Sequence, residues 1–181
     1  MAIITFWNNN TDKIGQTHSA LATASYMAIE HNYKVLLVST RYGDNVLREA
    51  FIGERKTGMF QFLSNSKPRV DIESGIEGMS MLAMANRLVP DMVPNYTKII
   101  YKNRLEIISA PRKKEETDYD KLYDSCKDIL AISRKHYDII FVDVNNGLEN
   151  DTTKEILNMS DIIILNIEQK LSEMKKILKF K

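Results

Sequence analysis

The sequence has little of several residue types, and each shortage excludes a class of protein. Cys126 is the single cysteine, so an internal disulfide is excluded and a reducing cytosol is the natural setting. Only 7 glycines and 4 prolines occur in 181 residues, which excludes collagen-like and low-complexity chains. No apolar run approaches the roughly 20 residues that span a bilayer, and the first residues lack the basic lead of a signal peptide. We therefore expect a cytoplasmic protein.

The chain also lacks an excess of charge of either sign. Lys and Arg number 25 and Asp and Glu 24, which gives a formal net charge of +1. Such a balance provides no general attraction for nucleic acid or for anionic lipid, so neither DNA nor a membrane is supported as a partner. Hydrophobic residues make up 44% of the chain and charged residues 27%, the balance of a globular protein. The length predicts one domain over residues 1–181.

Apolar runs alternate with amphipathic segments along the whole chain. The expected strands are residues 3–7, 35–38, 105–109, 137–142 and 162–167. The expected helices are residues 17–31, 46–51, 79–88, 118–136, 152–159 and 171–180. Strands separated by such helices predict an α/β fold, a three-layer α/β/α arrangement around a mostly parallel sheet. In such sheets ligands bind beyond the carboxyl ends of the strands.

Three loops lie at those ends. The loop after the first strand ends in Gly15-Gln16-Thr17-His18, the second is Ser39-Thr40-Arg41-Tyr42-Gly43, and the third is Asp143-Val144-Asn145-Asn146-Gly147. In this order and spacing the chain resembles the ParA/MinD group of P-loop ATPases, which position plasmids, division sites and pili. The resemblance implies a P-loop NTPase-like fold, ATP and Mg²⁺ as cofactors, and a homodimer.

The first loop departs from the phosphate loop of that family, Lys-Gly-Gly-x-Gly-Lys-Thr-Thr. Gly15 and Thr17 match, but Gln16 stands in place of the lysine that reaches the phosphates. Thr11 replaces the lysine that crosses the dimer interface, and Asp12 and Lys13 replace two glycines. Glutamine can donate a hydrogen bond, but it supplies no cation for the charge of a transferred phosphoryl group.

The resemblance nevertheless implies a set of site residues. The nucleotide-binding residues would be Lys13, Gly15, Gln16, Thr17, His18, Asp143 and Gly147, with Thr17 and Asp143 serving Mg²⁺. The family has Asp-x-Asp at the end of the second strand, where this chain has Ser39 and Arg41, and Asp44 lies close by. The residues identify no catalytic group. A competing interpretation is a polar connection into a helix that Asp12 or Thr17 caps.

These departures favour a degenerate ParA/MinD-like protein, a pseudo-ATPase with weak or absent hydrolysis. It would act as a positioning or scaffold factor in plasmid partition, conjugative transfer, or localisation of a pilus or secretion machine, and would engage a partner protein. The alternative is an active ATPase in which Lys13 supplies the missing cation and Asp44 or Asp143 positions water. Members of the family continue with further strands that help to hold the base, so the domain is either short or truncated at its C-terminus.

Overall fold

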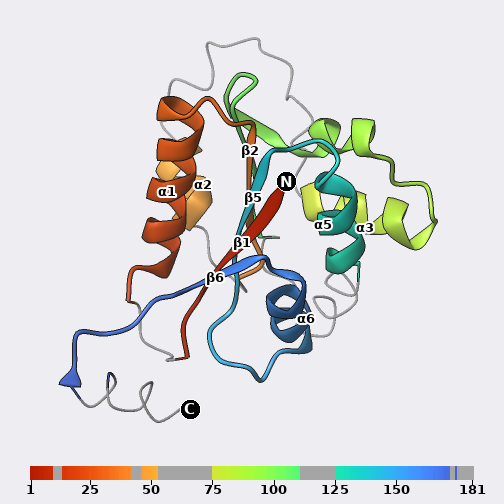
Figure 1. Cartoon of the computed structure of the whole chain (residues 1–181). Helices are drawn as coiled ribbons and strands as arrows, with labels where there is room; N and C mark the ends of the chain where they lie inside the picture. Colours follow the sequence, from red (N-terminus) through yellow and green to blue (C-terminus); the bar gives the residue numbers. More distant parts are fainter. Residues whose placement is uncertain (10–13, 42–45, 53–74, 111–124, 172–173, 175–181) are drawn as a thin grey trace, which may run out of the picture.

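One six-stranded sheet organises the molecule (Figure 1). The computed structural model describes residues 1–9, 14–41, 46–52, 75–110, 125–171 and 174. The strands are β1 (Ala2–Trp7), β2 (Val35–Ser39), β3 (Lys98–Tyr101), β4 (Leu105–Ile108), β5 (Ile139–Asp143) and β6 (Ile162–Leu165). Their order in the sheet is β3-β4-β2-β5-β1-β6, and all neighbours are parallel except β3 and β4. The predicted mostly parallel sheet is confirmed.

Helices cover both faces of this sheet. They are α1 (Gln16–Glu30), α2 (Val46–Ile52), α3 (Gly75–Met84), α5 (Cys126–Ser133) and α6 (Asp151–Met159), together with the 3₁₀ helix η2 (Pro90–Tyr96). Figure 1 shows α1 and α2 on one side of the strands and α3, α5 and α6 on the other. The three-layer α/β/α arrangement follows, because central strands that are apolar on both faces need cover on each side.

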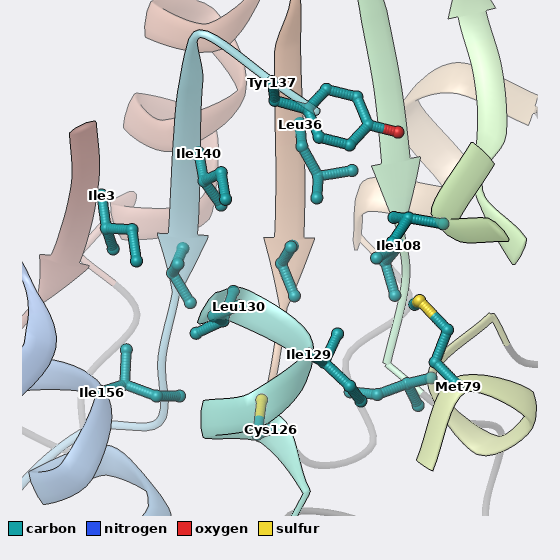
Figure 2. Close-up of a cluster of buried hydrophobic side chains, with 14 of the residues drawn as sticks. Ile3, Leu36, Met79, Ile108, Cys126, Ile129, Leu130, Tyr137, Ile140 and Ile156 are labelled. Carbon is teal, nitrogen blue, oxygen red and sulfur yellow. The ribbon is translucent and has the colours of Figure 1, made fainter. Parts of the chain in front are cut away.

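The side chains of the central strands β2 and β5 alternate between two buried clusters. On the α1 side, Leu37 and Phe141 meet Ala20, Ala24 and Ala28, none of which is exposed. These alanines repeat every fourth residue, so one narrow face of α1 packs closely against the sheet. Figure 2 shows the opposite cluster, where side chains of the sheet meet those of the helices. Its labelled members are Ile3, Leu36, Met79, Ile108, Cys126, Ile129, Leu130, Tyr137, Ile140 and Ile156.

Two segments of the structure differ from the sequence prediction. No helix or strand was predicted between residues 88 and 105, but the structure has η2 and β3 there, and β3 pairs antiparallel with β4. The helix expected at 79–88 spans Gly75–Met84. A Cβ atom at Gly75 would lie 1.9 Å from the carbonyl oxygen of Tyr96, so the glycine permits a close approach to η2. Glycine has a weak helix propensity, yet α3 begins at Gly75. Tertiary packing against η2 therefore determines where this helix begins.

Two predicted helices extend beyond the described part of the chain. Of residues 118–136, the structure describes 125–136, and the helix there is α5. Of residues 171–180, it describes only Leu171 and Met174, both helical and both exposed. The remainder of each prediction lies outside the described residues.

The strand β6 forms one margin of the sheet. Among the described strands it pairs with β1 alone. Three of its aliphatic side chains are partly exposed, Ile162 at 52%, Ile163 at 48% and Leu165 at 39%. No helix among the described residues has both the length and the apolar character needed to cross a membrane.

Candidate functional site at the carboxyl ends of three strands

The carboxyl ends of β1, β5 and β2 lie side by side at one edge of the sheet. Phe6 of β1 pairs with Asp143 of β5, and Ser39 of β2 pairs with the same residue. Asp143 therefore lies between the ends of the two other strands, directly beside the start of α1. Because α1 follows β1 through a loop at this edge, residues from all three predicted loops meet here.

Gln16 is the centre of the polar contacts at this edge. Its side chain is buried, and its Nε2 lies at hydrogen-bonding distance from three acceptors: Asp143 Oδ1 at 2.7 Å, the carbonyl of Val144 at 2.8 Å and that of Phe6 at 2.9 Å. Two N–H groups of the Gln16 amide serve these three acceptors, so one of them is shared. Its Oε1 accepts a hydrogen bond of 2.8 Å from Asn8 Nδ2. The amide thus joins the first turn of α1 to β1 and β5. Burial makes these bonds important, since an unpaired amide would lose its hydration without compensation.

Asp143 is completely buried, and a cation lies near its carboxylate. Oδ1 accepts the hydrogen bond from Gln16, and Arg41 Nη1 lies 3.9 Å from the same oxygen. Two hydrogen bonds of the backbone position Arg41. The backbone N–H of Arg41 donates to Ser39 Oγ at 3.3 Å, and the backbone N–H of Thr40 donates to the carbonyl of Asp143 at 3.0 Å. A buried carboxylate needs such partners, because isolating its charge in the protein interior is costly.

The loop after β5 is fastened to the end of β1. The N–H of Gly147 donates to the carbonyl of Asn8 at 2.9 Å, and the indole N–H of Trp7 donates to the carbonyl of Gly147 at 2.9 Å. Asn8 Nδ2 also donates to Asn146 Oδ1 at 3.1 Å. Gly147 has a φ of 70°, a left-handed conformation that glycine adopts without strain. The third loop is therefore held beside the entry to α1.

Gly15 leaves the N-terminus of α1 without a capping side chain. It is the residue before α1, with a φ of 78°, and a Cβ atom there would meet nothing within 4 Å. As a glycine it offers no side chain to cap the helix. The first N–H groups of a helix and its dipole attract negative charge, so the start of α1 fits a phosphate group. Thr17 is buried in this first turn, whereas His18 is exposed.

Some predicted site residues lie outside the described part of the chain. They are Thr11, Asp12, Lys13 and Asp44. The contribution of Lys13 to phosphate binding, the capping by Asp12 and the substitution of Asp44 for a lost carboxylate stay predictions. The structure does bring together Gly15, Gln16, Thr17, Asp143 and Gly147.

Three further side chains at the site carried no clear signal in the sequence. Asn8 bonds to Gln16 and to Asn146, and Asn145 Nδ2 donates to the carbonyl of Thr40 at 3.1 Å. Asparagines directly after a strand are typical of many loops, so their type alone does not indicate a site. Only the neighbouring carboxyl ends of β1, β2 and β5 bring Asn8 to Asn146 and Asn145 to Thr40.

No protein-family model matches the sequence, and a search of the curated proteins finds no match. Solved structures do match, at 16% sequence identity and over 98% of this chain. They include a ParA family ATPase from Chlorobium tepidum at a TM-score of 0.68, the kinase domain of the Escherichia coli tyrosine kinase ETK at 0.66, and the septum site-determining protein MinD from Pyrococcus horikoshii, complexed with Mg-ADP, at 0.62. The chain has the fold of the ParA and MinD ATPases. It spans 66%, 60% and 65% of the length of these three chains, respectively.

The ParA/MinD fold suggests a site for ATP and Mg²⁺. The residues present suit the phosphates of ATP better than they suit the metal ion. The start of α1 fits a phosphate, as described above. Thr17 and Asp143 offer the hard oxygen donors that Mg²⁺ prefers. However, the Asp143 carboxylate is already bonded to Gln16, and the neighbouring Arg41 repels a second cation. The arrangement around Asp143 therefore does not favour Mg²⁺, although the donor types suit it.

Proposed function

We propose that this protein is a degenerate member of the ParA/MinD group, a positioning or scaffold factor that binds nucleotide weakly and hydrolyses ATP slowly or not at all. The observation that carries the proposal is the bonding of Gln16. The residue that replaces the phosphate-binding lysine is neutral, buried and turned toward Asp143, Val144 and Phe6. Its amide makes bonds inside the protein that a phosphate contact would have to break, and it brings no charge to stabilise phosphoryl transfer.

The end of β2 supports the same conclusion. Where the family has carboxylates that help to position the attacking water, this chain has Ser39 and Arg41. Ser39 is buried, and its hydroxyl accepts the N–H of Arg41. A serine bonded in this way is no base, and a guanidinium is permanently protonated and cannot accept a proton. Neither residue supplies the carboxylate that could accept a proton from the attacking water.

The function would therefore rest on interaction. Gly15 and the first turn of α1 would bind the phosphates of a nucleotide, and Gly147 would be held beside them through Asn8. We propose a homodimer whose contact face lies beside the phosphate loop, and a partner protein in plasmid partition, conjugative transfer, or pilus or secretion localisation. The proposed setting is the cytoplasm. Thr17 and Asp143 stay the proposed ligands for any Mg²⁺ that enters.

The experiment that tests this function is calorimetric titration with ATP and Mg²⁺, followed by measurement of phosphate release. We expect weak binding or none, and phosphate release that does not exceed the rate without protein. Thr17→Ala and Asp143→Asn are the matched variants, because an active P-loop site would need both residues. ATP turnover by the native chain that disappears in both variants would contradict the proposal.

A further inference from the structure

The amino ends of three parallel strands meet at the edge of the sheet opposite the candidate site. Val35, the first residue of β2, pairs with Leu105 of β4 and with Ile139 of β5. The residues before these strands are therefore neighbours, and the N–H of Val35 donates to the carbonyl of Arg104 at 2.7 Å. Three connecting segments form what we call the amino-edge surface: residues 30–34, 101–104 and 135–138.

Side-chain contacts join the three segments of the amino-edge surface. Arg104 Nη1 donates to the carbonyl of Asn32. The backbone N–H of Lys34 donates to Asp138 Oδ2 at 2.8 Å, and Lys34 Nζ contacts His136 Nε2. Figure 1 shows the connection between α1 and β2 beside the hairpin of β3 and β4. The amino-edge surface is thus one continuous face.

The tyrosines that are exposed in the described part of the chain all lie at this face. Tyr26 of α1 is 57% exposed, Tyr33 41% and Tyr101 55%. The ring of His31 links two of them, since its centre is 5.2 Å from that of Tyr26 and 6.4 Å from that of Tyr33. Tyrosine is enriched at protein interfaces because it combines a broad apolar ring with a polar hydroxyl. These rings therefore suit contact with another protein.

The amino-edge surface carries more positive than negative charge. Its cations are Lys34, Lys102, Arg104 and Lys135, and its carboxylates are those of Glu30 and Asp138. In the part of the chain that the structure describes, none of these four cations forms an ion pair with a carboxylate. The ammonium of Lys34 instead contacts His136 and lies 5.1 Å from the centre of the Tyr137 ring. This unpaired positive charge is complementary to an acidic partner.

We propose that the amino-edge surface docks an acidic segment of the partner protein, an inference that rests on the proposed function because that function requires such a partner. Carboxylates of the segment would pair with Lys102, Arg104 and Lys135, and its apolar side chains would pack on the exposed tyrosine rings. A nucleic acid fits less well, because its regularly spaced phosphates would pass the carboxylates of Glu30 and Asp138. A peptide can place neutral residues beside those two groups.

The test is fluorescence anisotropy of a labelled random copolymer of glutamate and tyrosine, titrated with the full chain. We expect saturable binding that weakens as salt is added, since exposed charges are screened. The copolymer of lysine and tyrosine, which has the opposite charge, should not bind. Joint substitution Lys102→Gln and Lys135→Gln should weaken binding about fivefold or more, because two exposed ion pairs are lost. The matched control is Arg87→Gln with Lys127→Gln, which removes the same charge at two exposed positions outside this face and should bind as the native chain does.

A second variant, Tyr26→Ser with Tyr33→Ser, removes two rings and keeps every charge, so we expect binding about fivefold weaker or more. Circular dichroism and thermal melting would show whether each variant folds, and the lysine variant decides if the tyrosine variant does not. The inference is wrong if the acidic copolymer does not bind, if both copolymers bind equally, or if neither double variant loses affinity. Tighter binding of oligothymidine than of the acidic copolymer would also overturn it and would indicate a nucleic-acid surface.

The same measurements separate this inference from the proposed function. The amino-edge surface lies at the opposite edge of the sheet from the candidate site, so both double variants should leave calorimetric titration with ATP unchanged. ATP turnover by the native chain would contradict the proposed pseudo-ATPase without changing the copolymer result. Failure of copolymer binding alone would remove the acidic partner and leave the nucleotide proposal as it is.

Discussion

Glu106 of β4 is a buried carboxylate that accepts hydrogen bonds from two hydroxyl groups. Tyr137 Oη and Thr97 Oγ1 each donate to Glu106 Oε2 at 2.5 Å. Burial and the neighbouring carboxylate raise the pKa of Tyr137 well above its ordinary value. Figure 2 shows the ring of Tyr137 at the margin of the apolar cluster, so this residue has both a packing role and a hydrogen-bonding role.

Tyr137→Phe should lower the free energy of unfolding by about 1–3 kcal/mol, because the buried Glu106 loses one of its donors while the ring packing stays. Urea unfolding would measure this loss. The tyrosine in the native state holds its proton more tightly than in the unfolded chain. Its contribution is therefore present at neutral pH and declines as the pH rises above about 10, where the unfolded tyrosine ionises.

The native chain should consequently lose more stability in alkali than Tyr137→Phe does. Tyr26→Phe is the matched control, since Tyr26 is 57% exposed and its loss should change little. Equal stability of the Tyr137 variant and the native chain at neutral pH would contradict the assigned hydrogen bond.

Cys126 is a buried thiol of the same apolar cluster. Burial, and to a smaller extent the charge of Glu155, raises the pKa of Cys126 to about 12, as expected of a structural thiol.

The helix α6 begins at Asp151, a few residues after the loop from Asp143 to Gly147. Asn150 precedes the helix in an extended conformation, and its Oδ1 accepts the N–H of Thr153 at 3.0 Å. A side chain that caps a helix in this way replaces a bond that the first turn cannot make internally. The cap therefore fixes the start of α6.

Asn150→Ala should cost about 1 kcal/mol of stability, the typical value for a lost N-cap. Chemical denaturation would show the change as a lower urea midpoint with an unchanged slope. Asn150→Asp is the control, because aspartate accepts the same hydrogen bond and favours the positive end of the helix dipole. A loss of equal size in both variants would mean that the cap is not the source of the stability.

The whole described sheet shares its central strands between the two apolar clusters. Val35 and Leu37 of β2 face one cluster, and Leu36 and Val38 of the same strand face the other. If β2 left the sheet, side chains of both clusters would therefore become exposed to solvent. The two clusters of the described residues are thus coupled through β2, and the single domain over residues 1–181 stays a prediction.

We accordingly expect one cooperative transition in urea. Trp7 is the only tryptophan of the chain, and its indole N–H is bonded to Gly147, so its fluorescence reports on β1 and the site loop. Far-UV circular dichroism reports on all the helices. The two transitions should coincide, and a fluorescence change at clearly lower urea would instead show that the site opens before the core unfolds.

Much of the fold could be predicted from local pattern. Apolar runs such as Val35 to Val38 predicted strands, and the amphipathic pattern over residues 17–31 predicted the helix that the structure has as α1. The glycines of α3 were misleading: Gly75 and Gly78 are weak helix formers, yet both lie in the helix because they pack against Tyr96. A contact between distant segments carries no signal in a local window.

At the site, the sequence by itself determined the residue types: a glycine before α1, an amide in place of a lysine, and an arginine at the end of β2. It thereby determined which charges are absent. Only the tertiary structure decided that Gln16 turns inward and that Arg41 shares an oxygen of Asp143 with it. The reason is physical, since these groups lie far apart along the chain. Their contact exists only because β1, β5 and β2 are hydrogen-bonded in one sheet and end at the same edge.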